Sequence, residues 1–100
     1  MTKIVVTMVE GEVDPARVPD LLEGFPAKSV DELPEFILGT MLVRQSDSNS
    51  WRVVTLWRSM GDLEEYLESV ETPGAKAAFQ AAGVEPSVTV WNADRVLFDM

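Results

Sequence analysis

Apolar and β-branched side chains are densest at residues 51–57, and this segment predicts a central strand of the fold. Successive side chains of a strand point to opposite faces. One face therefore carries Trp51, Val53, Thr55 and Trp57. The other face carries Val54 and Leu56, which are also apolar. A strand with one face in water would alternate cleanly between apolar and polar residues. The pattern predicts that both faces of this strand are covered.

The segment that follows predicts an amphipathic helix. Ser59 is a helix N-cap type of residue, and Asp62 stands three residues later, as in a shorter version of the capping box. Apolar residues then recur at helical spacing at Leu63, Tyr66, Leu67 and Val70. The glutamates of this segment fall on the opposite side, and we expect them to be a solvated face.

The first part of the chain predicts a strand at residues 3–9, a turn at residues 10–14 and a short helix. Asp14 and Pro15 are typical of a helix start, with Asp as the N-cap and Pro at the first helical position. Pro19 leaves two possibilities: either the first turn is separate, or the helix proper starts near Val18. Gly24 is the expected end of this helix.

A connecting loop at residues 25–34 follows, with room for one helical turn begun by Ser29 and Glu32. Residues 35–45 predict the second strand, in which Gly39 indicates either a bulge or a close approach to the backbone. The polar residues 47–50 predict a hairpin loop, which would make the second and third strands antiparallel neighbours.

Thr72 and Pro73 predict a further helix by the same capping logic, and Gly83 is its expected end. The last strand is predicted at residues 87–98, with a break or bulge at residues 92–94. The order strand, helix, two strands, two helices, strand is that of an α+β, ferredoxin-like fold. We expect one domain over residues 1–100, with a four-stranded antiparallel sheet and its helices on one face.

Helices on one side leave the other side of such a sheet apolar and bare. A soluble monomer rarely exposes a large apolar patch. We therefore expect a homodimer packed through the sheet face, because a second copy of the chain would bury this apolar face.

Composition excludes several kinds of function. The chain has 17 acidic and 8 basic residues, a net charge of −9, which argues against nucleic acid and anionic membranes as partners. It has neither cysteine nor histidine, so disulfides, thiol chemistry and the usual metal ligand are absent, and we expect no metal site. No apolar run is long enough to span a bilayer. These features fit a cytoplasmic protein.

Two short motifs resemble those of the antibiotic biosynthesis monooxygenase domain family, which forms dimeric α/β barrels. Residues 33–39, Leu-Pro-Glu-Phe-Ile-Leu-Gly, lead into a strand, and residues 51–59 end in Trp-Arg-Ser. The family pattern is a Pro-Gly-Phe-x-Gly strand followed by a strand that ends in Trp-x-Ser. Glu35 stands where the family usually has glycine. The resemblance covers about residues 3–98.

The resemblance implies a ligand cleft between sheet and helices in each subunit. Some members oxidise aromatic polyketides with molecular oxygen and without metal or flavin, and others degrade haem. Trp57 matches the cleft-lining tryptophan of both groups. Quinone-forming members carry an asparagine four residues earlier, where this chain has Val53. Haem degraders carry an asparagine that falls at Thr7 or Met8, and a histidine that falls at Phe79.

The resemblance therefore implies an aromatic or polyketide-like ligand and no cofactor, and we expect that the residues contacting this ligand are Trp57, Tyr66, Phe79, Thr7 and Thr55. Each has a structural alternative, because tryptophan often anchors a core and threonine is common in strands. No carboxylate pair has a spacing that requires acid–base chemistry, so no catalytic residue is assigned. The lack of histidine argues against haem degradation.

Two functions remain open from the sequence. The first is a cofactor-independent monooxygenase acting on an aromatic small molecule. The second is a non-catalytic ligand-binding or structural dimer of the same fold. Val53 and Phe79 favour the second, because active relatives have polar residues at these positions. A roomy cavity with converging polar groups would count against it.

Overall fold

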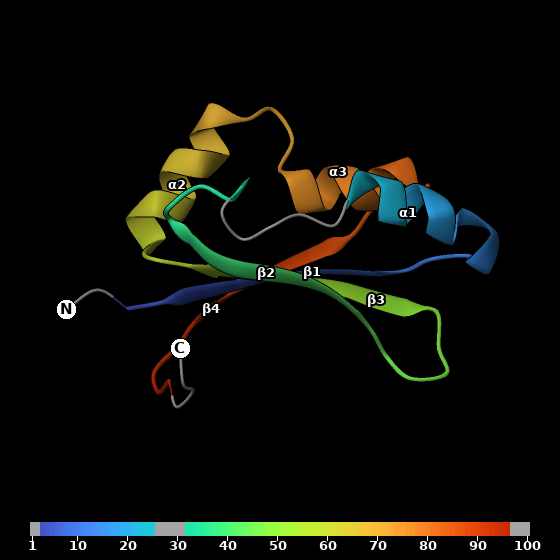
Figure 1. Cartoon of the computed structure of the whole chain (residues 1–100), viewed down its shortest axis with the longest axis horizontal. Coiled ribbons are helices and arrows are strands. Elements are labelled where there is room, and N and C mark those ends of the chain that lie inside the picture. The colour runs from blue at the N-terminus through green and yellow to red at the C-terminus, as the bar shows by residue number, and fades with distance from the viewer. Residues whose placement is uncertain (1–2, 26–31, 97–100) are drawn as a thin grey trace.

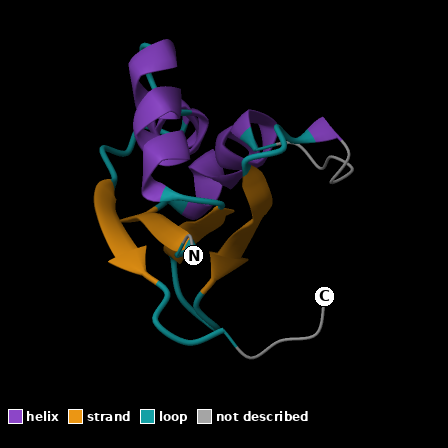
Figure 2. Cartoon of the chain, turned by 90° about the vertical axis from the view of Figure 1, so that its left-hand side faces the viewer, coloured by secondary structure: helices purple, strands orange, loops and turns teal. Residues whose placement is uncertain are grey.

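Four antiparallel strands form one sheet, and the helices lie on one of its faces (Figures 1 and 2). The computed structural model describes residues 3–25 and 32–96. The strands are β1 (Val5–Glu12), β2 (Ile37–Arg44), β3 (Ser50–Trp57) and β4 (Ser87–Asn92), in the spatial order β2-β3-β1-β4. The helices are α1 (Val18–Gly24), α2 (Met60–Ser69) and α3 (Gly74–Ala81), with a 3-10 turn, η1 (Pro15–Arg17). The predicted α+β, ferredoxin-like fold is confirmed.

Two of the predicted helix starts are confirmed by their hydrogen bonds. The Asp14 carboxylate accepts from the amide of Ala16 at 2.9 Å, and η1 forms a separate turn before α1 begins at Val18. The hydroxyl of Ser59 accepts from the amide of Asp62 at 3.1 Å and donates to its carboxylate at 3.0 Å. A capping side chain thus satisfies helix amides that would otherwise lack partners.

The predicted cap of α3 is wrong. Pro73 occupies the N-cap position, so Thr72 lies one residue too early, and no side chain of the N-cap bonds to the helix. The hydroxyl of Tyr66 on α2 accepts from the amide of Gly74 instead, at 3.1 Å. One free amide of α3 is therefore satisfied by a neighbouring helix.

Strand β1 is longer than predicted, and most of the turn predicted at residues 10–14 is wrong. Residues 10–12 continue the ladder with β3, where Glu10 pairs with Arg52 in register. Their side chains form an ion pair at 2.6 Å on the sheet face away from the helices, so the charges are accommodated within the strands. The two glutamates and one glycine of this segment gave it the composition of a turn.

Strand β4 ends earlier than predicted, at Asn92. The break predicted at residues 92–94 is confirmed, although the amide of Ala93 still donates to the carbonyl of Ile4 at 2.9 Å. The end of the predicted strand, residues 97–98, lies outside the described residues, as does the start of the helical turn predicted at Ser29. The predicted bulge at Gly39 is confirmed by a register shift between Ile37 and Gly39.

The core lies between the sheet and the helices. Its larger cluster brings the fully buried Phe79 and Leu21 onto Val13 and Val53. A smaller cluster joins Val5, Trp57 and Leu63 under α2. No helix among the described residues is long and apolar enough to cross a membrane.

The sheet face away from the helices, called here the open face, is largely apolar. Its residues include Val6, Met8, Met41, Val43, Val54, Leu56 and Trp91, which follow the register of the four strands. Met41 and Trp91 are 50% and 54% exposed. Both faces of the sheet are thus apolar, but helices cover only one of them (Figure 1).

Candidate functional site

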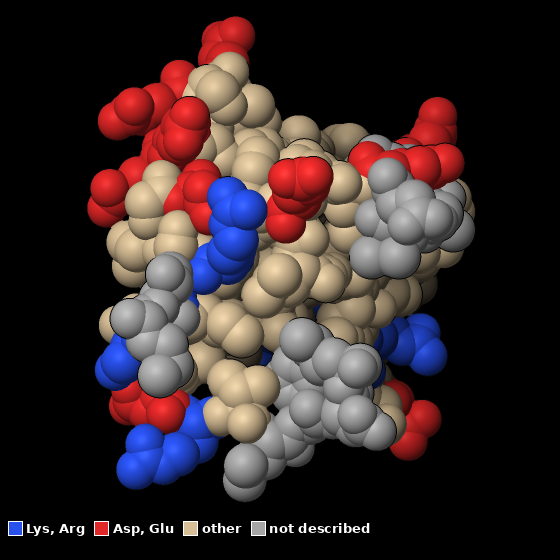
Figure 3. Space-filling view, turned by 60° about the vertical axis from the view of Figure 1, so that its left-hand side comes forward, with Lys and Arg blue, Asp and Glu red and all other residues tan. Residues whose placement is uncertain are grey.

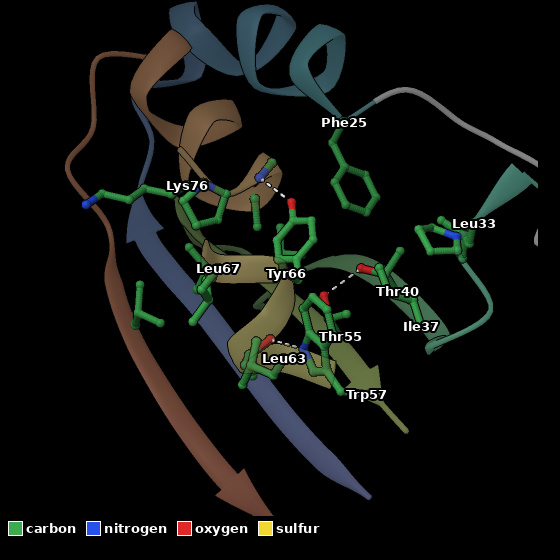
Figure 4. Close-up of a pocket in the computed structure, with 18 of the residues that line it drawn as sticks. Phe25, Leu33, Ile37, Thr40, Thr55, Trp57, Leu63, Tyr66, Leu67 and Lys76 are labelled. Carbon is green, nitrogen blue, oxygen red and sulfur yellow. Dashed lines mark hydrogen bonds between the residues drawn. The ribbon is translucent and has the colours of Figure 1, made fainter. Parts of the chain in front are cut away.

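A cavity of about 600 Å³ lies between the sheet and the helices, and we consider it the candidate site (Figure 4). The middle of β1 and β3 forms its floor. Residues of α2 and the first turn of α3 form a wall, and Phe25 at the end of α1 and Leu33 in the loop before β2 border the cavity. Most of the lining is apolar, and the volume is in the range of small-molecule sites.

The floor of the cavity carries three threonines in one row across the sheet, called here the threonine row. Thr40 of β2 is the register partner of Thr55 in β3, and Thr55 is the register partner of Thr7 in β1. The hydroxyls of Thr40 and Thr55 form a hydrogen bond of 2.9 Å, drawn in Figure 4. Thr7 and Thr55 are each only 7% exposed.

Trp57 joins this row to an aromatic wall. Its indole nitrogen donates to the hydroxyl of Thr7 at 2.9 Å. The ring of Trp57 lies 5.1 Å from that of Tyr66 and is stacked on Phe36 at 6.0 Å, measured between ring centroids. Aromatic groups in such offset or tilted pairs form a rigid apolar surface. A flat ligand would meet this surface beside the hydroxyls.

One mouth of the cavity opens beside β4. Val88 and Val90 point to the helix side of the sheet, because they are the register partners of Val9 and Thr7. They are 52% and 51% exposed. Lys76 borders the same mouth, and its side chain extends outward (Figure 4). Its ammonium group forms an ion pair of 3.3 Å with Glu85.

The charges of the chain lie outside the cavity. Acidic side chains cover much of the helix layer at the top of Figure 3. Among the described residues that line the cavity, none is a carboxylate, and the only ionised group is Lys76 at the mouth. Nor do three metal-ligating side chains come together anywhere in the described ranges. The polar atoms of the floor are therefore hydroxyls, which are able to donate hydrogen bonds.

The structure brings four of the five predicted site residues together. Thr7, Thr55, Trp57 and Tyr66 all line the cavity. Phe79 does not line it: the C-terminal half of α3 packs near Gly11, and this ring is fully buried in the larger core cluster. Thr40 was not predicted, although its pairing with Thr55 follows from the hairpin register, which is unbroken from Arg44 to Gly39.

The comparisons with known proteins concern the fold. No family model matches the sequence, and no curated protein matches it. A candidate antibiotic biosynthesis monooxygenase from Caulobacter crescentus has a similar structure, with 22% identity over 94% of this chain and 92% of that chain and a TM-score of 0.69. The chain has the fold of antibiotic biosynthesis monooxygenase-type proteins.

Two further solved structures show how varied the proteins of this fold are. A haem-degrading protein from Mycobacterium tuberculosis matches with 20% identity over 99% of this chain and all of that chain, with a TM-score of 0.69. SnoaB, a cofactor-independent oxygenase from Streptomyces nogalater, matches with 17% identity over 98% of this chain and 100% of that chain, with a TM-score of 0.62. Fold alone does not decide between such activities.

Proposed function

We propose that this protein binds a flat aromatic molecule in the cavity and catalyses its oxygenation by molecular oxygen without a cofactor. The observation that carries the proposal is the pairing of an aromatic wall with a floor of hydroxyl donors. A similar fold in SnoaB, a cofactor-independent oxygenase, supports it.

The chemistry suits a phenol- or anthrone-like substrate. Such a molecule loses a proton to water to give an electron-rich anion, which reduces O₂ itself. The ring CH₂ of an anthrone, or the para C–H of a phenol, then becomes a carbonyl, one oxygen atom is retained and the other leaves as water. The rings of Trp57 and Tyr66 would hold the substrate, and the hydroxyls of Thr7 and Thr55 would stabilise its anionic oxygen in a site with little water.

Oxygen uptake with anthrone as substrate tests this proposal. We expect uptake above the buffer blank, and a loss of about tenfold in Thr7→Val and Thr55→Val, because one charge-assisted hydrogen bond contributes roughly 1.5 kcal/mol. Thr72→Val is the matched control, since Thr72 is exposed and outside the cavity lining. Uptake equal to the blank for a panel of anthrones and quinols would count against an oxygenase.

The second candidate is a ligand-binding protein of the same fold without catalysis. The observation that favours it is the absence of carboxylate and imidazole groups among the described residues around the cavity, which leaves no ordinary general base. Saturable binding of anthrone without oxygen uptake would select this candidate. Haem degradation is not proposed, because Phe79 is a core residue and the sequence has no histidine.

We also propose that the protein is a homodimer in which two copies pack through their open faces. The apolar row of Met8, Val54 and Met41 crosses the middle of this face. Glu10 and Arg52 on the same face form an ion pair, and the other acidic residue of β1 on this face, Glu12, is the last residue of the strand and lies away from the apolar row, although the chain as a whole is strongly acidic. A second copy would therefore bury apolar surface without meeting a field of like charges.

A further inference from the structure

The threonine row has a regular spacing that the rest of the cavity lacks. Thr40, Thr55 and Thr7 occupy successive strands at matching register positions on the cavity side. Side chains opposite one another on neighbouring antiparallel strands have Cβ atoms roughly 5 Å apart. Valine has nearly the same shape and would fill these positions without a polar group. The three hydroxyls therefore place evenly spaced hydrogen-bonding atoms on an otherwise apolar floor.

The hydrogen bonds of the row leave two protons for a ligand. The Thr7 oxygen accepts from the indole of Trp57, so its own O–H is directed elsewhere. Within the Thr40–Thr55 pair one hydroxyl donates to the other, and the second proton stays free. Within the described part of the chain, no hydrogen bond joins Thr7 to Thr55. When Thr40 is the donor within the pair, the row presents one donor at Thr7 and one at Thr55, which lie opposite each other on neighbouring strands, and a ligand that needs both selects this arrangement.

We propose that these two donors select an aromatic ligand with two oxygen atoms in a meta relationship. Meta oxygens on a six-membered ring are separated by a distance similar to the strand spacing, whereas ortho oxygens are closer together. Each meta oxygen meets its own donor, while an ortho pair leaves one donor without a partner. A buried donor without a partner is costly, so the row discriminates between regioisomers. This inference rests on the proposed function, because the ligand occupies the same cavity.

Trp57 has a positioning role in this arrangement. Its N–H is committed to Thr7, so the indole does not itself offer a donor to the ligand. Because the indole N–H occupies one acceptor position of the Thr7 oxygen, the O–H of Thr7 points away from Trp57. Trp57→Phe keeps an aromatic ring but releases this constraint. We expect this variant to bind a naphthol with one oxygen nearly as well as before and to lose much of the preference for meta oxygens.

Calorimetric titration with naphthalene derivatives under anaerobic conditions tests the proposal. The probes are 1,3-dihydroxynaphthalene, 2,3-dihydroxynaphthalene and 2-naphthol. We expect the native protein to bind the 1,3-isomer about tenfold more tightly than the 2,3-isomer, the ratio that one net hydrogen bond supports. Thr7→Val and Thr55→Val should each remove most of this ratio and leave the affinity for 2,3-dihydroxynaphthalene within about twofold.

Thr72→Val again serves as the control and should keep the ratio. Equal affinity of the native protein for both isomers overturns the selection by the threonine row, while the proposed aromatic site stands. Failure of all three probes to bind overturns the site itself and the inference with it. Loss of binding for every probe in the two threonine variants, with the fold intact by circular dichroism, shows a general packing role and also overturns the selection.

Discussion

The hydroxyl of Tyr66 on α2 accepts a hydrogen bond from the amide of Gly74, the first residue of α3, at 3.1 Å. Tyr66→Phe removes this bond and keeps the ring against Trp57. We expect the free energy of unfolding to fall by about 1 kcal/mol, the usual net value of such a bond. For a domain of this size the melting temperature should fall by about 4–8 °C. Thermal denaturation followed by circular dichroism measures both.

Ser69→Ala is a suitable control for this prediction. The Ser69 hydroxyl donates to the carbonyl of Tyr66 within the same exposed helix end, at 2.8 Å. This bond does not join two elements, so its loss should change the melting temperature much less. Equal melting temperatures for Tyr66→Phe and the native protein would show that α3 does not need this cap.

The start of α2 should contribute a pH-dependent part of the stability. A hydrogen bond from Arg58 holds the pKa of Asp62 below its ordinary value of 3.8, and a hydrogen bond from Ser59 acts in the same direction. The unfolded chain therefore binds the proton more readily than the folded chain. The stabilisation is present above pH 3.8 and is lost as the pH falls through the lower pKa of the folded state.

Urea denaturation of the native protein and Asp62→Asn between about pH 6 and pH 3 measures this contribution. We expect the native protein to be more stable at the upper end and the difference to shrink toward the lower end. The other acidic residues are the same in both proteins, so their titration cancels. A difference that stays constant across this range would contradict the prediction.

Two glycines of the cavity lining should respond differently to alanine. A Cβ at Gly24 would lie 2.9 Å from the Cα of Ala78, because α1 and α3 pack closely there. Gly24→Ala should lower the free energy of unfolding by about 1–3 kcal/mol, the usual cost of overpacking against backbone. A Cβ at Gly39 would meet no atom within 4 Å. Gly39→Ala should therefore be nearly neutral by urea denaturation, and a large loss there would contradict the role of Gly39 as a bulge residue only.

The elements that the sequence predicts well are those decided by local chemistry. Ser59 caps α2 because a side-chain oxygen and the amides of the first turn lie within a few residues of each other. Gly39 marks a bulge because a strand interior without a side chain is poorly packed and easily bent. In both cases the interacting groups are neighbours along the chain.

The features that the sequence leaves open depend on contacts between distant segments. The cap of α3 by Tyr66 requires α2 and α3 to be placed relative to one another, which no local pattern gives. The sequence predicts that Phe79 contacts the ligand, but the position of α3 places this residue in the core and not in the cavity. Thr40 lies opposite Thr55 by the hairpin register alone, but only the packing of the helices over the sheet makes this pair part of a cavity.

The homodimer leads to the last prediction, which uses two residues of nearly equal exposure. Met41 on the open face is 50% exposed, and Leu22 on α1 is 47% exposed. If the open faces pack together, Met41→Glu buries an unpaired charge in the interface, which costs several kcal/mol. Leu22→Glu places the same charge in water on the helix layer. Sedimentation at micromolar concentration should therefore give a dimer for the native protein and for Leu22→Glu, and a monomer for Met41→Glu.

Both substitutions are at half-exposed positions of the protomer, so each variant should fold. A native monomer, or a dimer that Met41→Glu leaves intact, would mean that the open face is covered in some other way.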